Sequence, residues 1–245
     1  MGLVGPKIRK IGAKDDLIEN FLAVIKINTI VLATRNLHKV KEIQNMLGSG
    51  LQIRGLRDFN QVPEVAETAA TFEGNATLKA VGIANWLAGS EREEWFVLAD
   101  DSGLEVDPLD GAPGVNSARF AASDKTQGNS PDAENNAKLL RLLEAKPRPW
   151  RARFRCVLAL TPVPMTPPTA NTCLLEEAEF GARLFAGACE GQVVPTARGA
   201  HGFGYDPLFV PDGFEQSFAE LGEEIKNRIS HRAQAMKKLK AAILA

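Results

Sequence analysis

An apolar run that ends on two adjacent carboxylates constrains the fold more than any other stretch of this chain. Residues 96–99 (Phe-Val-Leu-Ala) predict a buried strand, and Asp100 and Asp101 end it with no residue between them. Ser102 and Gly103 then predict a turn. Neighbouring buried carboxylates repel and are hard to ionise, and a hard cation such as Mg²⁺ between them removes this conflict. The stretch therefore fits either an ordinary strand-to-turn junction or a cation site.

Strand and helix candidates alternate along the rest of the chain, which predicts an α/β fold. Strands are expected at residues 27–34, 51–59 and 151–160, with a pair at 178–185 and 188–194 around Gly187. Helices are expected at 36–48, 71–87 and 130–143, and in a basic C-terminal segment from about residue 230. In residues 104–109, apolar and acidic side chains alternate imperfectly, which predicts a half-exposed segment.

Composition excludes several classes of protein. The chain has 245 residues and a net charge of -1, so no basic field draws nucleic acid. No apolar run is long enough to span a bilayer, so no membrane partner is expected. The three cysteines form no Cys-x-x-Cys pair, which argues against a zinc site and favours a reduced, cytoplasmic setting. Residues 1–26 are predicted to form an N-terminal extension, and residues 27–245 are predicted to form a single domain.

A strand-to-helix turn at residues 34–39 predicts an anion site. Asn36 can cap the following helix, where backbone N–H groups and the helix dipole favour a negative charge. Thr34, Asn36 and Lys39 add side-chain donors. No Walker motif occurs in the chain, and most turns of this kind bind nothing, so the turn alone is weak evidence.

A glycine-rich segment at residues 199–207 carries Phe203, Tyr205 and Asp206. A turn needs only the glycines, so the two aromatic residues indicate a surface for stacking a planar ring. Core packing of at least one of them is the ordinary alternative. A Ser-His-Arg sequence at residues 230–232 adds hydrogen-bond donors. Together with the acids and the anion turn, these residues fit a metal-bound nucleoside polyphosphate.

The ordered set of motifs resembles the Ham1-like inosine triphosphate pyrophosphatase family, the XTP/dITP diphosphatases. Each motif alone is weak, but their common order from about residue 28 to the C-terminus is specific. The matching stretches are residues 32–39, 71–76 (TFEGNA), 99–104 (ADDSGL), 111–114 with 117–119, 203–207 (FGYDP) and 229–232 (ISHR).

The resemblance implies an elongated mixed central sheet flanked by helices, with the nucleotide in a cleft between two lobes, as in ITPase-like and anticodon-binding-like architectures. It implies Mg²⁺-dependent hydrolysis of dITP/ITP and XTP/dXTP to the monophosphate and pyrophosphate, by a homodimer acting on a small-molecule nucleotide.

By the family pattern, Asp101 is the general base and a metal ligand. Ser102 contacts substrate. The residues expected to hold phosphates are Thr34, Arg35, Asn36, Leu37, His38, Lys39 and Lys226; those expected to hold base and sugar are Phe203, Gly204, Tyr205, Asp206, His231 and Arg232. A 6-keto purine presents an acceptor, so a donor such as Arg232 favours it over adenine.

The metal ligands are the point of departure from the family. Two adjacent glutamates are common there, whereas this chain reads Ala66-Glu67. Glu67 is the predicted second ligand, Glu64 is an alternative, and Asp100 is a candidate acting through water. Arg35 also replaces a common glycine.

Two other functions compete with the diphosphatase. A catalytically inactive purine-nucleotide sensor is supported only by Ala66. A module that acts on damaged bases within a nucleic-acid strand is opposed by the near-zero net charge.

Overall fold

The computed structural model describes residues 27–48, 50–89, 94–122, 128–166 and 181–243. The predicted extension at 1–26, Cys173 and part of the proline-rich loop after Thr161 lie outside this range. The main elements in chain order are β1 (Thr29–Leu32), α2 (Leu37–Leu47), β2 (Gln52–Gly55), α3 (Phe72–Leu87), β3 (Trp95–Val106), α4 (Asp132–Leu143), β4 (Trp150–Pro162), β5 (Arg183–Val193), β6 (Phe209–Pro211), α6 (Phe218–Ile229) and α7 (His231–Ile243).

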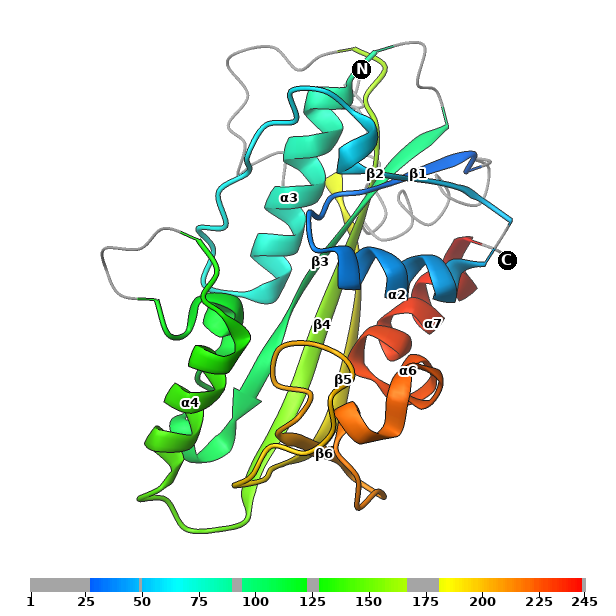
Figure 1. Cartoon of the computed structure of the whole chain (residues 1–245). Helices are drawn as coiled ribbons and strands as arrows, with labels where there is room; N and C mark the ends of the chain where they lie inside the picture. Colours follow the sequence, from blue (N-terminus) through cyan, green and yellow to red (C-terminus); the bar gives the residue numbers. More distant parts are fainter. Residues whose placement is uncertain (1–26, 49, 90–93, 123–127, 167–180, 244–245) are drawn as a thin grey trace, which may run out of the picture.

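These strands form one mixed sheet, which confirms the predicted fold class. Their order is β2-β1-β3-β4-β5-β6. β1 pairs in parallel with β2 and β3, whereas β3–β4, β4–β5 and β5–β6 are antiparallel. The long strands β3, β4 and β5 run the length of the molecule and give it an elongated shape (Figure 1).

The apolar core consists of three clusters: two belong to the first lobe, one on each face of the sheet, and the third belongs to the second lobe. In the first lobe, α3 packs on one face of the sheet and α2 with α7 on the other (Figure 1). The third cluster joins the far halves of β3, β4 and β5 to α4 and α6. The middle of β3 therefore runs from one lobe into the other.

The acids lie in the middle of a strand, and the predicted turn after them is wrong. Asp100, Asp101, Ser102 and Gly103 all pair with β4, in the register Asp100↔Leu158 to Gly103↔Arg155. β3 then continues through residues 104–106. Its Leu104 and Val106 are fully buried in the third cluster, whereas Glu105 is partly exposed and Asp107 is exposed, so the predicted half-exposed segment is confirmed.

Two further predictions are wrong in detail. In the described residues, β5 is one continuous strand from Arg183 through Gly187 rather than a pair, and residues 178–180 of the predicted pair lie outside the described range. Gly187 allows α7 to approach closely and does not form a turn. A side chain at position 187 would clash with the His231 carbonyl and the Ala235 amide. The predicted serine cap at residue 130 is also absent, since α4 begins at Asp132 with Pro131 in the cap position and no side-chain cap bond.

Candidate active site

Asp100 and Asp101 point to opposite faces of the sheet. Successive side chains of a strand alternate between faces. Asp101 therefore meets Lys79 of α3, and Asp100 meets Lys39 of α2 and Arg232 of α7. The repulsion expected between two adjacent acids is relieved because each carboxylate has cationic partners of its own.

Asp101 keeps one carboxylate oxygen without a partner. Its Oδ1 accepts from Lys79 Nζ at 2.8 Å, whereas its buried Oδ2 has no hydrogen-bond partner among the described residues. Burial raises the pKa of Asp101 to about 6, although the ammonium groups of Lys79 and Lys39 oppose this rise. A carboxylate with a raised pKa and a free oxygen in a cavity is suited to accept a proton.

Lys79 joins Asp101 to the acidic loop that precedes α3. Lys79 Nζ lies 3.3 Å from Glu67 Oε2 as well as 2.8 Å from Asp101 Oδ1. Burial lowers the pKa of Lys79, but the two carboxylates outweigh it and raise the pKa above its usual range. The loop is anchored to α3 by a hydrogen bond from Ala69 N to Asn75 Oδ1 at 2.9 Å.

Asp100 is the centre of a buried ion-pair network. Arg232 Nε donates to its Oδ2 at 2.8 Å, and Lys39 Nζ lies 2.5 Å from Oδ1. Ser102 Oγ donates to Oδ1 at 2.9 Å, and Cys156 Sγ lies 3.2 Å from Oδ2. Burial would raise the pKa of Asp100, but Arg232 and Lys39 hold it well below its ordinary value. Asp100 is therefore ionised and fully partnered.

The turn before α2 is built as predicted, with Asn36 as the cap. Asn36 Oδ1 accepts from the backbone N–H groups of His38 at 2.9 Å and Lys39 at 3.3 Å, and Thr34 Oγ1 accepts from Asn36 N at 3.2 Å. These N–H groups are thus occupied within the turn rather than free for an anion. Arg35 donates to the Val62 carbonyl at 3.0 Å.

The glycine-rich loop brings both aromatic residues to one cavity. Phe203 stacks on His38 with ring centroids 5.2 Å apart, and Lys226 Nζ lies 4.5 Å from its ring centre. Tyr205 is buried in the third cluster, and its hydroxyl donates to the Ser117 carbonyl at 3.0 Å. Tyr205 therefore has a packing role, and Phe203 remains the residue with the more accessible ring.

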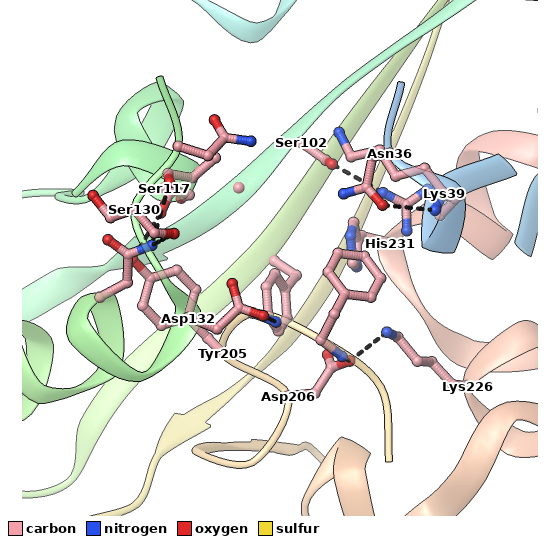
Figure 2. A pocket seen from close by; sticks show the side chains of 18 residues that line it. Asn36, Lys39, Ser102, Ser117, Ser130, Asp132, Tyr205, Asp206, Lys226 and His231 are labelled. Atoms are coloured by element: carbon pink, nitrogen blue, oxygen red, sulfur yellow. Dashed lines mark hydrogen bonds and ion pairs between the residues drawn. The ribbon is translucent and has the colours of Figure 1, made fainter. Parts of the chain in front are cut away.

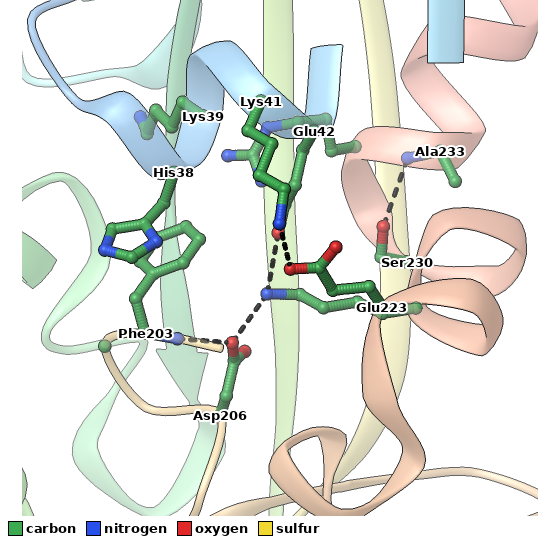
Figure 3. Close-up of polar contacts among 12 residues, drawn as sticks. His38, Lys39, Lys41, Glu42, Phe203, Asp206, Glu223, Ser230 and Ala233 are labelled. Carbon is green, nitrogen blue, oxygen red and sulfur yellow. Dashed lines mark hydrogen bonds and ion pairs between the residues drawn. The ribbon is translucent and has the colours of Figure 1, made fainter. Parts of the chain in front are cut away.

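The ammonium group of Lys226 lies against the Phe203 ring and belongs to a buried network. Figure 3 shows three residues that Lys226 contacts, Glu42, Phe203 and Asp206. Its Nζ contacts Asp206 Oδ2 at 2.6 Å and Glu42 Oε1 at 3.0 Å. The other oxygen of Glu42 accepts from Arg232 Nη1. Burial raises the pKa of Asp206 despite the Lys226 ammonium. Glu42 thus joins Lys226 and Arg232, both of which line the aromatic cavity.

His231 lies in the same cavity with an unused ring nitrogen. Its ring stacks on Phe154 with centroids 4.8 Å apart, and its buried Nδ1 has no partner among the described residues. Burial, with the nearby Arg232 and Lys226, holds its pKa well below the usual value. His231 is therefore neutral and can present a ring nitrogen to a ligand.

Most of the predicted site residues line two adjoining cavities. The aromatic cavity has Phe154, Phe203, Tyr205 and His231 in its wall (Figure 2), and the acidic cavity has Glu64, Glu67, Lys79, Asp100 and Asp101. The two share a wall formed by Asn36, Lys39, Ser102, Ala118 and Asn129. A ligand with a ring at one end and a charged chain at the other can therefore span both.

The predicted residues separate between these cavities. Thr34, Arg35, Asp101, Glu64 and Glu67 line only the acidic cavity. The aromatic cavity alone is lined by Gly204, Asp206, Lys226, His231 and Arg232. Leu37 and His38 line neither; Leu37 is exposed, and His38 reaches the site through Phe203.

Lys79 and Glu42 belong to the two networks but lie outside the sequence motifs. Lys79 follows the TFEGNA motif by one helical turn from Asn75, and Glu42 follows Lys39 by three residues on α2. Helical spacing places each pair on one face. That spacing from a recognised motif residue is the signal that identifies them.

A divalent cation fits the acidic cavity only in a water-rich form. No group of three or more His, Cys, Asp or Glu side chains that could hold a metal occurs in the described part of the chain. The free Oδ2 of Asp101 and the carboxylates of Glu67 and Glu64 nevertheless face one cavity. Mg²⁺ commonly binds one or two carboxylates and keeps several waters, so this donor set fits it.

Comparison with known proteins identifies relatives along most of the chain. A model described as the Ham1 family matches residues 30–242. A dITP/XTP pyrophosphatase of Exiguobacterium sibiricum is 45% identical over 216 residues, which cover 87% of this chain and 96% of the relative. One from Desulforamulus reducens is 46% identical over 213 residues, with 85% and 92% covered.

Solved structures agree with the fold. A HAM1 protein from Coxiella burnetii superposes with a TM-score of 0.71 at 34% identity, covering 89% of this chain and 98% of the other. The Staphylococcus aureus Ham1 protein gives a TM-score of 0.68 at 33% identity, with 87% and 97% covered. In the described part of the present chain, no helix has the length and apolar character needed to cross a membrane.

Proposed function

Because this chain belongs to the Ham1 family, we propose that it hydrolyses non-canonical purine nucleoside triphosphates to the monophosphate and pyrophosphate. Its substrates are dITP/ITP and XTP/dXTP. The observation that carries the proposal is the shared wall between the two cavities. A purine placed against Phe203 leaves its phosphates directed past Lys39 toward Asp101.

Asp101 is the general base of the proposed reaction. Water is a poor nucleophile until a carboxylate orients it and accepts its proton. The unpartnered Oδ2 of Asp101 is available for this role, while Lys79 fixes Oδ1. The ammonium groups of Lys79 and Lys39 also offset the charge of the phosphates in the acidic cavity.

The acidic cavity also offers ligands for Mg²⁺. Asp101 and Glu67 would hold the ion, with Glu64 as the alternative to Glu67 and Asp100 as a candidate only through water. Asp100 is the weaker candidate, because Arg232, Lys39, Ser102 and Cys156 already contact it. When bound, Mg²⁺ supplies charge neutralisation on the phosphates and a site for water.

The base and sugar occupy the aromatic cavity in this proposal. Phe203 supplies the stacking surface, and Gly204 to Asp206 form the wall beside it. Most Arg232 donors are engaged by Asp100, Ser102 and Glu42, so the unpartnered Nδ1 of His231 is a second candidate for reading the base edge. A polar group left unpaired by the wrong base can reject it strongly, on the order of 10⁴-fold in favourable sites.

A homodimer and a cytoplasmic location complete the proposal. Both come from the family resemblance. The described cysteines, Cys156 and Cys189, are free thiols, which is compatible with a reducing compartment. Light scattering of the purified protein tests the dimer, because a monomer at micromolar concentration would contradict it.

Pyrophosphate release from dITP, XTP and dATP tests the function directly. With Mg²⁺, we expect turnover of dITP and XTP at rates on the order of 10²-fold or more above that of dATP. A chelator should abolish turnover, and added Mg²⁺ should restore it. Equal rates on dATP, or no pyrophosphate from any substrate, would overturn the proposal. Calorimetric binding of dITP without turnover would instead support a nucleotide sensor.

A further inference from the structure

Both backbone polar groups of Gly204 are held by one face of α4. Gly204 N donates to Asp132 Oδ2 at 2.6 Å, and Asn136 Nδ2 donates to the Gly204 carbonyl at 3.1 Å. Asp132 and Asn136 are four residues apart, so their side chains share one face of the helix. Gly204 has φ of 63°, in the left-handed region that glycine adopts readily. Two hydrogen bonds thus fix a residue that has wide conformational freedom.

The fixed peptide lies between the two aromatic residues of the cavity. Gly204 connects Phe203 to Tyr205, so the orientation of its peptide groups sets the directions of both side chains. Tyr205 is fixed at its far end as well, through its hydroxyl and the Ser117 carbonyl. Figure 2 shows Asp132 beside Tyr205 and Asp206 at the cavity.

The same turn of α4 also holds a second segment of the cavity wall. Asn135 is buried, and its Oδ1 accepts from Ala121 N at 2.7 Å. Its Nδ2 donates to the Ala118 carbonyl at 3.3 Å. Ala118 and Gly204 both line the aromatic cavity. The first turn of α4 therefore sets the position of two walls that belong to distant parts of the sequence.

We propose that Asp132 and Asn136 are positioning residues for the nucleoside moiety of the substrate, because they hold the Gly204 peptide and through it Phe203. The proposal rests on the proposed function only in taking the ligand of the aromatic cavity to be a nucleoside. Neither side chain reaches the acidic cavity, so the effect is confined to the nucleoside end.

Replacement of Asp132 tests the proposal through KM. Asp132→Ala removes the acceptor of the Gly204 N–H and should raise KM for dITP about tenfold, while kcat changes less than about threefold. Asp132→Asn keeps a side-chain carbonyl in the same place and should return KM to within about threefold of the unaltered protein. Asn136→Asp keeps the shape, places an acceptor against the Gly204 carbonyl, and should raise KM at least as much as Asp132→Ala.

Two controls separate positioning from a general structural loss. Tripolyphosphate carries no nucleoside, so its inhibition constant should be the same in all variants. Glu134→Ala removes an exposed acid from the same helical turn, and the Glu134 side chain makes no hydrogen bond or ion pair in the described part of the chain, so KM should not change. An unchanged KM in Asp132→Ala, or a parallel weakening of tripolyphosphate, would overturn the proposal.

Failure of the proposed function would be seen separately. If the unaltered protein does not hydrolyse dITP, calorimetry with dIMP replaces KM as the measurement. Weaker dIMP binding in Asp132→Ala with recovery in Asp132→Asn then supports the positioning role without turnover. Equal dIMP affinity in all variants overturns it.

Discussion

Arg232 and Asp100 form a buried two-point ion pair at the centre of the molecule. Arg232 Nε donates to Asp100 Oδ2 at 2.8 Å, and Nη2 lies 3.3 Å from Oδ1. Arg232 is 1% exposed and Asp100 2%. Arg232 belongs to α7 and Asp100 to the middle of β3, so the pair joins the C-terminal helix to the strand that carries the catalytic candidate. The pair therefore stabilises the site, and its two residues also line the cavities: Arg232 the aromatic one and Asp100 the acidic one.

Neutralising Asp100 should destabilise the fold. Asp100→Asn leaves the buried charges of Arg232 and Lys39 without their carboxylate, a loss that typically costs ~3–5 kcal/mol. We expect urea unfolding at pH 7 to show a decrease of this size in the free energy of unfolding. In the unaltered protein, the stabilisation by ionised Asp100 is present above its unfolded pKa of 3.8 and is lost as the pH falls below that value, because its folded pKa is lower still.

The exposed pair between Arg151 and Asp212 is the matched control. Its side chains are 43% and 54% exposed, and its Nη1–Oδ1 distance is 2.7 Å. Asp212→Asn should cost ~1 kcal/mol or less, because solvent screens exposed pairs. An Asp100→Asn variant no less stable than Asp212→Asn would contradict the role assigned to the buried pair.

Asp101 should be essential for turnover but costly for the fold. Asp101→Asn removes the proposed base, so kcat should fall by at least about 10²-fold. The same change removes a charge that burial disfavours, so the metal-free protein should be as stable or more stable. Pyrophosphate release and urea unfolding measure the two effects. Full activity of the variant would exclude Asp101 as the base.

The pH dependence of stability gives an independent check on Asp101. Its pKa rises from 3.8 to about 6 on folding, so the folded state binds more protons between these values. The unfolding free energy of the metal-free protein should therefore fall, relative to Asp101→Asn, as the pH rises from about 4 to about 7. The expected size is ~1–3 kcal/mol, and a difference that grew with pH would have the wrong sign.

Much of the first lobe follows from local sequence patterns. The Asn36 cap and the Gly48 end of α2 and the Thr71 cap of α3 are confirmed, because capping needs only a few adjacent residues. The end of the strand at Asp100 was predicted wrongly. Aspartate and glycine are disfavoured within strands, but here Lys79 and Arg232, from distant helices, neutralise the two acids inside the sheet. Local propensity contains no information about such partners.

The division of the site between two cavities is likewise a property of the tertiary structure. The sequence motifs predicted a set of site residues, but they did not predict that Lys226 lies against Phe203 or that Glu42 links Lys226 to Arg232. The contact between Glu42 and Arg232 joins residues 190 positions apart. The geometry of these contacts depends on how α6 and α7 pack against α2, which no short motif describes.

The stack of His38 on Phe203 should influence nucleotide binding. His38→Ala removes a ring that lies 5.2 Å from Phe203, and aromatic pairs contribute ~0.5–1.5 kcal/mol. KM for dITP should rise about 2- to 10-fold, with kcat little changed. His38→Phe retains a ring and should keep KM within about twofold. If His38→Ala leaves KM unchanged, the stack does not support the base-binding surface.

The position of Lys226 decides between two roles for its ammonium group. The family pattern predicts that it holds phosphates, whereas its contacts are with Asp206, Glu42 and the Phe203 ring in the aromatic cavity. If Lys226 supports the aromatic cavity rather than the phosphates, Lys226→Met should weaken binding of dIMP and dITP by about tenfold or more and leave inhibition by tripolyphosphate unchanged. Calorimetry and inhibition kinetics measure these quantities.

Lys39→Met is the comparison, because Lys39 lines both cavities and should affect tripolyphosphate as well as dIMP. Lys226→Met also leaves Asp206 and Glu42 buried without their cation, so its unfolding free energy must be measured alongside. Lys226→Arg retains the charge and should recover most of the stability. If Lys226→Met weakens tripolyphosphate as much as Lys39→Met does, Lys226 holds phosphates, and the assignment drawn from its contacts is wrong.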